Sequence, residues 1–461
     1  MASAQVSRPM INDKREIFGW AMYDWANSAF STTVGTVFLG PYLASLASAA
    51  AAANPDGMAR LAGIPIAPDS FFPYCISLSV LLQVLFLPIL GAIADYSHRR
   101  KQMMQLFATL GAAATILMFL VTGPVWWLGG LLFLLANLAF GASIVFYNSY
   151  LPDIASEDQR DRVSSYGWAM GYLGDAILLA LNLAFYLLHD KLGVPTAVAV
   201  RINLASAGVW WLSFSFFTWM RLRARGAAKQ LPRGETYVRV GFRQLWGTIR
   251  EMGNFPETIK FLVAYFLYND GIQTVISVSA TFAAAPLIRG GVGMDQSTLT
   301  IVILMIQFMA FLGALAWRRL AGRVGAKRSV VISLVIWSAV VIYAYFGLKG
   351  DSRVLEFFIL GAVIAMVLGG SQAISRSLYS LVIPAGKQAE YYSFYEVSDK
   401  GTSWFGPLLF GLVNQLTGSL RPAILSLIFF FVAGLVLLPF FNVKKAIADV
   451  KRFEARQGLD T

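Results

Sequence analysis

Two aspartates lie within long apolar stretches of this chain of 461 residues, and each begins the same short polar pattern. An amide follows three residues after the acid, and hydroxyls follow after four and seven: Asp24, Asn27, Ser28 and Ser31, then Asp270, Gln273, Thr274 and Ser277. These offsets fall on one face of a helix. Burying an ionisable side chain in hydrocarbon costs about 2.5 to 3.5 kcal/mol, so such groups usually face a water-filled path. The repeated pattern predicts a transporter built from two repeats.

The composition indicates a membrane protein, because 57% of the residues are hydrophobic and only 13% are charged. A helix needs about 20 mostly apolar residues to cross a bilayer. About twelve such runs are present: 17–48, 70–94, 102–122, 126–150, 163–188, 197–220, 259–288, 297–317, 329–348, 354–381, 391–416 and 422–441. We therefore predict an all-α polytopic membrane protein with about 12 transmembrane helices.

The positions of the basic residues predict the orientation of the chain. Most of the 37 Lys and Arg residues fall in loops on one side of the membrane if both termini are cytoplasmic. Cytoplasmic loops carry such an excess, so we expect a cell-membrane protein with both termini inside. The net charge of +12 does not indicate a nucleic-acid partner, because the basic residues flank the spans without interleaved aromatic residues. Cys75 is the only cysteine, which excludes a disulfide within the chain.

The longest polar interval divides the apolar runs six and six. We predict an N-terminal bundle over 1–220, a cytoplasmic linker over 221–257, a C-terminal bundle over 258–441 and a cytoplasmic tail over 442–461. Within the linker, Val240 to Met252 has apolar residues near helical spacing. This segment fits a helix on the inner leaflet, and a solvated basic linker is an equally good interpretation.

Further repetition supports two pseudo-symmetric bundles. The fourth and tenth runs carry polar residues at identical spacing: Gly141, Ser143, Asn148 and Ser149, and Gly369, Ser371, Arg376 and Ser377. Parallel six-helix repeats are a known plan for transporters. The interiors of the third, sixth, ninth and twelfth runs contain no ionisable residue, so we expect every third helix to face lipid.

Three further ionisable residues are candidates for the pathway. The planar guanidinium of Arg376 would bind a carboxylate or phosphate through two hydrogen bonds, or it would neutralise Asp24 or Asp270. Lys400 follows Glu396 by four residues, the favoured order for an ion pair within a helix, so substrate contact and internal pairing both remain open. Asp175 is either a third proton site or a satisfied packing group.

The remaining candidates would form a polar lining, and they are Tyr23, Asn27, Asn148, Asn269, Gln273 and Gln372. We expect Asp24 and Asp270 to face each other in a hydrated cavity where the bundles meet, as proton-coupling sites or as sites for a substrate amine. A buried cation together with carboxylates suits a zwitterion such as an amino acid. The other interpretation is that both aspartates only hold helices together.

The loop after the second run carries a glycine, an acid and a basic triplet: Gly91, Asp95, Arg99, Arg100 and Lys101. We expect a cytoplasmic gating hinge in which Gly91 permits close helix approach and Asp95 accepts hydrogen bonds at a helix start. The basic triplet would meet anionic lipid headgroups. This spacing resembles the signature loop of the major facilitator superfamily, with His98 in a slot that is often Gly.

A narrower resemblance rests on three segments: Gly19 to Ser28 (GWAMYDWANS), Tyr268 to Asp270 (YND) and Gln372 to Ser377 (QAISRS). They resemble the vacuole-effluxer family tied to autophagy and its bacterial relatives, over nearly all of the chain. The resemblance implies a twelve-helix facilitator fold and, from the fungal members, export of amino acids. The second copy of the signature loop has Gly322 where Asp would be expected, which puts a second hinge in doubt.

The sequence favours a transporter over an enzyme. The only two histidines, His98 and His189, lie in loops, and His-Glu-x-x-His, Walker and nucleophile-elbow motifs are absent. We expect no cofactor and no bound metal. The predicted function is secondary active transport of a small polar solute by a monomer, through alternating access and with proton coupling. The alternative is a passive pore or a lipid-moving protein.

Overall fold

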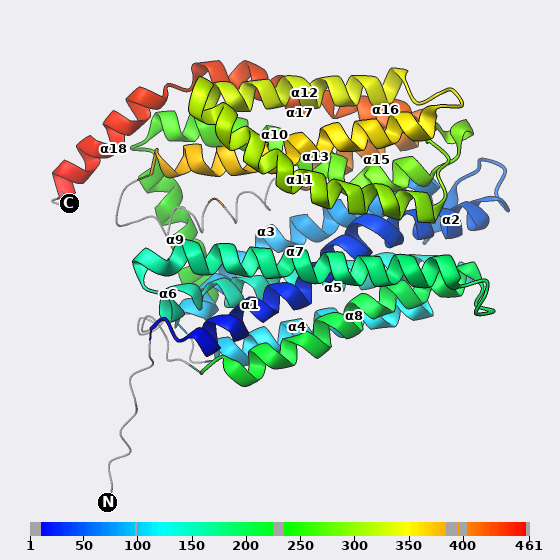
Figure 1. Ribbon diagram of the computed structural model, residues 1–461, viewed down its shortest axis with the longest axis horizontal. Coiled ribbons are helices and arrows are strands. Elements are labelled where there is room, and N and C mark those ends of the chain that lie inside the picture. The colour runs from blue at the N-terminus through cyan, green and yellow to red at the C-terminus, as the bar shows by residue number, and fades with distance from the viewer. Residues whose placement is uncertain (1–10, 97–98, 225–234, 384–394, 396–402, 458–461) are drawn as a thin grey trace, which may run out of the picture.

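A computed structural model of the protein describes residues 11–96, 99–224, 235–383, 395 and 403–457. Nearly all of them are helical, and the helices run side by side along the long axis in two layers (Figure 1). The N-terminal half forms the lower layer in this view, and the C-terminal half forms the upper layer.

The N-terminal half contains an unusual first helix. α1 (Lys14–Ala29) continues through the π-helical segment η1 (Phe30–Phe38) into α2 (Leu39–Ala51). The other elements of this half follow in order: the hairpin β1 (Ala59–Leu61) and β2 (Ile64–Ile66), η2 (Pro68–Ser70), α3 (Phe71–Tyr96), α4 (Arg100–Leu117), η3 (Met118–Leu120), η4 (Gly123–Val125), α5 (Trp126–Asn148), α6 (Leu151–Ile154), α7 (Glu157–Leu188) and α8 (Thr196–Arg221). A π-helical segment often marks a functional site.

The C-terminal half begins after α9 (Tyr237–Met252), which packs against α3 of the first half. Its elements are α10 (Pro256–Ala284), η5 (Leu287–Arg289), α11 (Gln296–Val324), α12 (Ala326–Phe346), α13 (Arg353–Ser380), α15 (Phe405–Thr417), α16 (Leu420–Ser426), α17 (Ile428–Leu437), η6 (Leu438–Phe440) and α18 (Val443–Gln457). Gly325 has φ 88° and joins α11 directly to α12. Only glycine adopts this conformation at little cost.

The helix contacts of the two halves correspond. α3 and α4 both pack on α5, and in the second half α11 and α12 both pack on α13. α8 packs on α1 and α4, as α17 packs on α10 and α12. The two pseudo-symmetric bundles predicted from the repeats are therefore confirmed.

The described residues contain 10 helices long and apolar enough to cross a membrane. α11 has a shorter apolar segment, Gln296–Ala310, and the predicted run 391–416 lies mostly outside the described residues, with α15 as its described part. These two segments account for the difference from the twelve predicted spans.

Exposed apolar side chains are more widespread than expected. Exposed apolar residues occur on α4, α8, α12 and α17, for example Leu110, Phe216, Val335 and Val436. α7 exposes Leu181 and several other large apolar side chains as well. Exposed apolar side chains are therefore not restricted to every third helix.

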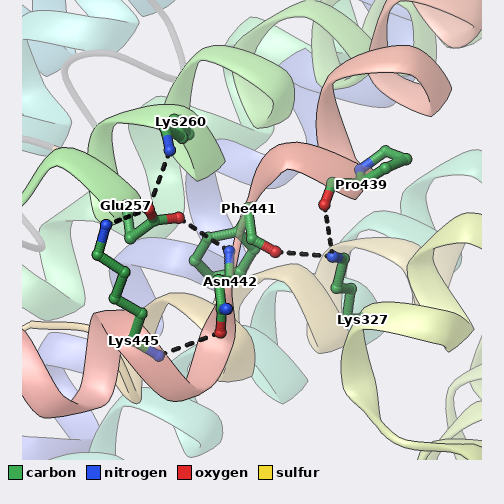
Figure 2. A network of polar contacts seen from close by, with 7 residues as sticks. All are labelled: Glu257, Lys260, Lys327, Pro439, Phe441, Asn442 and Lys445. Atoms are coloured by element: carbon green, nitrogen blue, oxygen red, sulfur yellow. Dashed lines mark hydrogen bonds and ion pairs between the residues drawn. The ribbon is translucent and has the colours of Figure 1, made fainter.

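Glu257 joins several segments at the end of the C-terminal half that carries α18 (Figure 2). Its carboxylate accepts a hydrogen bond from the backbone N–H of Asn442 at 2.9 Å and pairs with Lys260 at 2.9 Å and Lys445 at 3.3 Å. Nearby, Lys327 donates to the carbonyl oxygens of Pro439 and Phe441. These contacts attach the start of α18 to the starts of α10 and α12.

The helix predicted within the linker is present as α9. Val240 and Met252 are buried, whereas Phe242, Trp246 and Arg243 are exposed. One side of α9 therefore contacts the protein, and the other presents aromatic and basic side chains.

Candidate functional site

A cavity of about 250 Å³ lies between the two halves, at the level of the π-helical segment. Its lining comes from η1, α3 and α5 of the first half and from α10 and α15 of the second: Phe30, Ser31, Gly35, Thr36, Ile76, Val80, Gln83, Phe133, Asn137, Phe140, Gln273, Ile276, Ser277, Ser403 and Pro407. Polar groups from both halves thus face one space.

The two repeated polar patterns meet in this cavity at their ends. Ser31 stands seven residues after Asp24, and Ser277 stands seven residues after Asp270, and both serines line the cavity. Gln273 from the second pattern lines it too. Neither aspartate belongs to the lining. The expectation that the two acids face each other is not met in this cavity, which the first stripe enters at Ser31 and the second at Gln273 and Ser277.

Two lining amides come from the middle of predicted spans. Gln83 of α3 donates a hydrogen bond to the carbonyl oxygen of Asn137 at 2.8 Å, and the Asn137 amide donates to Ser79 Oγ at 2.8 Å. Neither Gln83 nor Asn137 is among the residues predicted from the sequence. Both are amides inside apolar runs, and this feature of the sequence could have identified them. An unpaired amide is costly in hydrocarbon, so such a residue is expected to have a polar partner.

Asp24 is half-buried and bonded within its own half. Its Oδ2 accepts a hydrogen bond from the hydroxyl of Tyr147 at 2.7 Å. Trp20 stacks on Tyr147 with ring centroids 4.3 Å apart, and Tyr23, fully buried, lies 5.2 Å from the same ring. A Cβ atom on Gly167 of α7 would lie 2.6 Å from Asp24 Oδ2. The acid therefore sits where α1, α5 and α7 approach closely.

Asp270 is buried in the second half, with different partners. Its Oδ2 accepts the backbone N–H of Gly406 at 2.9 Å, and the Thr274 hydroxyl lies 3.5 Å from Oδ1. Gly406 belongs to the first turn of α15. The carboxylate thus caps the start of that helix, where negative charge is favourable.

Of the three acids predicted for the pathway, Asp175 is the one with hydrogen-bond partners in both halves. Its Oδ2 accepts hydrogen bonds from Thr32 of η1 at 2.6 Å and from Gln307 of α11 at 3.0 Å. The side chain is buried, and its Oδ1 has no hydrogen-bond partner.

The other predicted lining residues are scattered. Asn27 is buried with its amide nitrogen unpaired, and Asn269 is buried on α10. Asn148 is half-buried and is the last residue of α5. Gln372 is half-buried in the second half of α13. Arg376 lies on α13, and its side chain is outside the described part of the structure, as is all of Lys400.

The predicted gating loop differs from expectation at its basic residues. Gly91 and Asp95 lie on α3, and Arg99 is exposed. Arg100 is buried and pairs with Asp153 at 2.8 Å. The next residue, Lys101, donates to the carbonyl oxygen of Leu222 at 2.6 Å. The expectation that this triplet meets lipid headgroups is therefore wrong for two of its members, which bind groups of the protein.

One end of the cavity is closed by contacts between the halves. Ser70 of η2 donates to the carbonyl oxygen of Gly411 at 2.8 Å and accepts from Asn414 at 2.9 Å. Tyr74 donates to Gln415 at 3.0 Å. This is the end that the charge distribution assigns to the outside, and we call it the outer end.

The residues that the structure describes include no group of three His, Cys, Asp or Glu side chains that could hold a metal ion. The cavity offers amide and hydroxyl groups and three phenylalanines, Phe30, Phe133 and Phe140. Such a lining can bind a small polar molecule but supplies no nucleophile paired with a base.

Comparison with known proteins gives the family. The chain matches the family described as "Vacuole effluxer Atg22 like" over residues 12–451. It is 30% identical over 423 residues to the uncharacterized MFS-type transporter YxiO of Bacillus subtilis, covering 91% of this chain and 93% of that protein. It is 25% identical over 538 residues to autophagy-related protein 22-1 of Penicillium rubens, covering 92% and 88% of the two chains.

Solved structures share the fold. The nucleoside transporter NupG aligns with a TM-score of 0.59 at 15% identity, covering 93% of this chain and 97% of that one. The inward-open xylose transporter XylE from E. coli aligns with a TM-score of 0.59 at 13% identity, covering 95% and 98%. The chain belongs to the vacuole effluxer Atg22-like family and has the fold of the major facilitator superfamily of membrane transporters.

Proposed function

We propose that the protein is a secondary active transporter that carries a small polar solute by alternating access and is coupled to protons. One observation carries this proposal: Ser31 and Ser277, which occupy matching positions in the two repeats, line the same cavity. The outer end above this cavity is closed by hydrogen bonds between the halves. A site shared by both halves can open to either side when the halves rock. A solute bound there would cross without a continuous pore.

The rocking units in this proposal are residues 1–220 and 258–441, joined by the linker 221–257 and followed by the tail 442–461. We place the protein in the cell membrane as a monomer with both termini in the cytoplasm. The segment from Gly91 to Arg100 would act as the inner hinge. Arg100 supports this role, because its pair with Asp153 fixes the start of α4, where the segment ends, to α6.

The lining suggests the chemistry of the solute. The named side chains Gln83, Asn137, Gln273 and Ser277 bear amides and a hydroxyl, and no charged residue is among the described lining. Amides and hydroxyls orient a polar solute through directed hydrogen bonds, while the phenylalanines contact its apolar parts. An amino acid is the first candidate, with Arg376 as the proposed partner of its carboxylate. Uptake of neutral sugars and nucleosides is to be compared with uptake of amino acids, because these solutes are polar but carry no carboxylate.

The test is uptake into proteoliposomes from a mixed pool of amino acids, sugars and nucleosides, with and without an imposed pH gradient. Saturable uptake that exceeds equilibrium only under the gradient supports secondary active transport. Arg376→Gln should reduce uptake of an amino acid but not that of a neutral sugar.

Two results would refute the proposal. Flux that never saturates and never accumulates would instead support a passive pore. Absence of saturable transport for every solute of the pool, in protein shown to be folded and inserted, would remove the proposed solute class.

A further inference from the structure

The carboxylate of Asp175 is shared between the two halves of the protein. It accepts hydrogen bonds from Thr32 at 2.6 Å and from Gln307 at 3.0 Å, both on Oδ2. Asp175 and Thr32 belong to the first half, whereas Gln307 lies on α11 of the second. Any rocking motion that separates α7 from α11 must break the bond to Gln307.

The surroundings of Asp175 contain few other ionisable groups. Within the described residues it has no cationic partner, and its Oδ1 is buried without a hydrogen bond. Tyr172 lies one turn away on α7, and Asp24 packs against Gly171, also one turn away. η1 contains no titratable residue, and the arginines of α11 lie near its inner end. The carboxylate is therefore in no ion pair with any residue that the structure describes.

Asp24 and Asp270 differ from Asp175 in the location of their partners. Asp24 is bonded to Tyr147, and Asp270 to Gly406, so each pair moves within a single half. A ligand shifts a conformational equilibrium only if it binds the two states with different free energy. A proton on either of these acids would change contacts that rigid-body rocking leaves intact. A proton on Asp175 would change a contact that rocking breaks.

We propose that Asp175, with Gln307 as its partner in the opposite half, is the proton-coupling site of the transporter, a proposal that rests on the transport function above. The proton comes from water on one side of the membrane and leaves to water on the other. Thr32 remains with Asp175 in both states and keeps the carboxyl group oriented.

The direction of coupling follows from the hydrogen bonds. An ionised carboxylate accepts a hydrogen bond about twice as strong as a neutral group does, so ionised Asp175 stabilises the contact with Gln307 and the closed outer end. When α11 moves away, the carboxylate loses this donor, which disfavours its ionised form relative to the neutral acid. Protonation therefore favours the state in which the outer end is open. By linkage, opening of the outer end raises the proton affinity of Asp175.

The first test measures conformation and needs no substrate. Spin labels are placed in a Cys75→Ala background at Lys191→Cys and Lys349→Cys, two exposed positions in outer turns of opposite halves. Pulsed electron paramagnetic resonance then gives the distance distribution in proteoliposomes at about pH 6 and about pH 8. In otherwise unaltered protein we expect a shift toward longer distances at the lower pH.

Three variants decide the assignment. Asp175→Asn imitates the neutral acid, so its distribution should be long at both pH values. Gln307→Met removes the donor in the opposite half and should also abolish the pH response. Thr115→Val on α4, the matched control, removes a buried hydroxyl that bonds to the carbonyl oxygen of Gly111 in its own helix and should keep the response. The proposal is overturned if Asp175→Asn responds to pH like the parent, or if the parent does not respond.

The second test uses transport. Asp175→Asn should lose accumulation driven by a pH gradient while it retains exchange of labelled for unlabelled solute, which needs no net proton movement. Gradient-driven accumulation at the parent level in this variant would reject Asp175 as the coupling site. If the parent protein carries no solute of the pool, the proposed function fails, and the distance measurement still decides the role of Asp175.

Discussion

Asp69 and Arg289 form an ion pair that crosses between the two halves at the outer end, with Nη1 and Oδ2 2.9 Å apart. The side chain of Asp69 is only 4% exposed, and Arg289 also donates to Ser48 at 2.8 Å. These residues lie on η2, η5 and α2, which are short or terminal elements at the end of the spans. Because the pair joins the two halves at this end, separation of the halves there would break it, so we expect the pair to stabilise the closed state.

Removing the cation should open the outer end. Arg289→Gln leaves Asp69 buried without its partner, which costs of the order of 3 kcal/mol in the closed state and little once water enters. We expect Ser277→Cys, in a Cys75→Ala background, to react several-fold faster with a membrane-impermeant thiol reagent applied outside. Arg353→Gln is the control, because Arg353 bonds to Val292 within its own half. An unchanged labelling rate in Arg289→Gln would show that the pair does not hold the closed state.

The lining amide of the second half should affect the transported solute directly. Gln273→Leu keeps the volume of the side chain but removes its hydrogen bonds, each worth about 1 kcal/mol or more. We expect the KM for a transported solute to rise about tenfold, since 1.4 kcal/mol corresponds to that factor. Ser333→Ala on α12 is a matched loss of a buried polar group away from the cavity. Equal kinetics for both variants would remove Gln273 from the binding site.

The fold was largely predictable because its signals are local and long. Twelve apolar runs and two copies of one polar pattern are visible in the sequence, and they predict spans and repeats. The interruption of the first helix by the π-helical segment Phe30–Phe38 was not visible in that way. A change from α to π geometry depends on packing against α7, α8 and α10, which no local pattern records.

The site was less predictable because partners come from distant helices. Asp24 and Asp270 begin identical patterns, yet one is bonded to a tyrosine and the other to a backbone N–H. Asp175 was predicted as a candidate from its ionisable side chain, but its link to the second half depends on Gln307, an amide within another apolar run that no local pattern connects to Asp175. Arg100 was assigned to the lipid surface from its place in a loop, although Asp153 binds it. Residue type identified candidates, and only the packing distinguished their roles.

We expect Asp270 to matter more for the thermal stability of the protein than for the pH-dependent change in conformation. Asp270→Ala removes the acceptor for the backbone N–H of Gly406 and so leaves the start of α15 uncapped, at a cost of about 1 to 2 kcal/mol. Asp270→Asn keeps an acceptor oxygen and should cost less. Thermal unfolding in detergent should therefore show a larger loss for alanine than for asparagine. The reverse order would mean that the charge of Asp270, and not its hydrogen bond, stabilises the contact.

The close approach of α15 to α10 should depend on Gly406. A Cβ atom at this position would overlap the hydroxyl of Thr274 and lie 2.8 Å from Asp270 Oδ1. Gly406→Ala should therefore displace α15 and lower the thermal stability clearly. Gly322→Ala is the matched control on α11, where a Cβ atom would meet nothing within 4 Å, and there alanine should raise stability by up to about 1 kcal/mol. Similar behaviour of the two variants would contradict the packing described for Asp270.

The two neighbouring arginines of the predicted hinge should behave differently. Arg100 bonds to Asp153 at 2.8 Å and to the carbonyl oxygen of Ser149 at 3.1 Å, and its guanidinium lies 5.3 Å from the ring centroid of Tyr150. Loss of a buried pair of this kind costs of the order of 3 kcal/mol, so Arg100→Gln should lower the unfolding temperature by several degrees. Arg99 is exposed, and Arg99→Gln should change stability by less than about 0.5 kcal/mol. If Arg99→Gln proved the more damaging change, the pair of Arg100 with Asp153 would not be what fixes the start of α4 to α6.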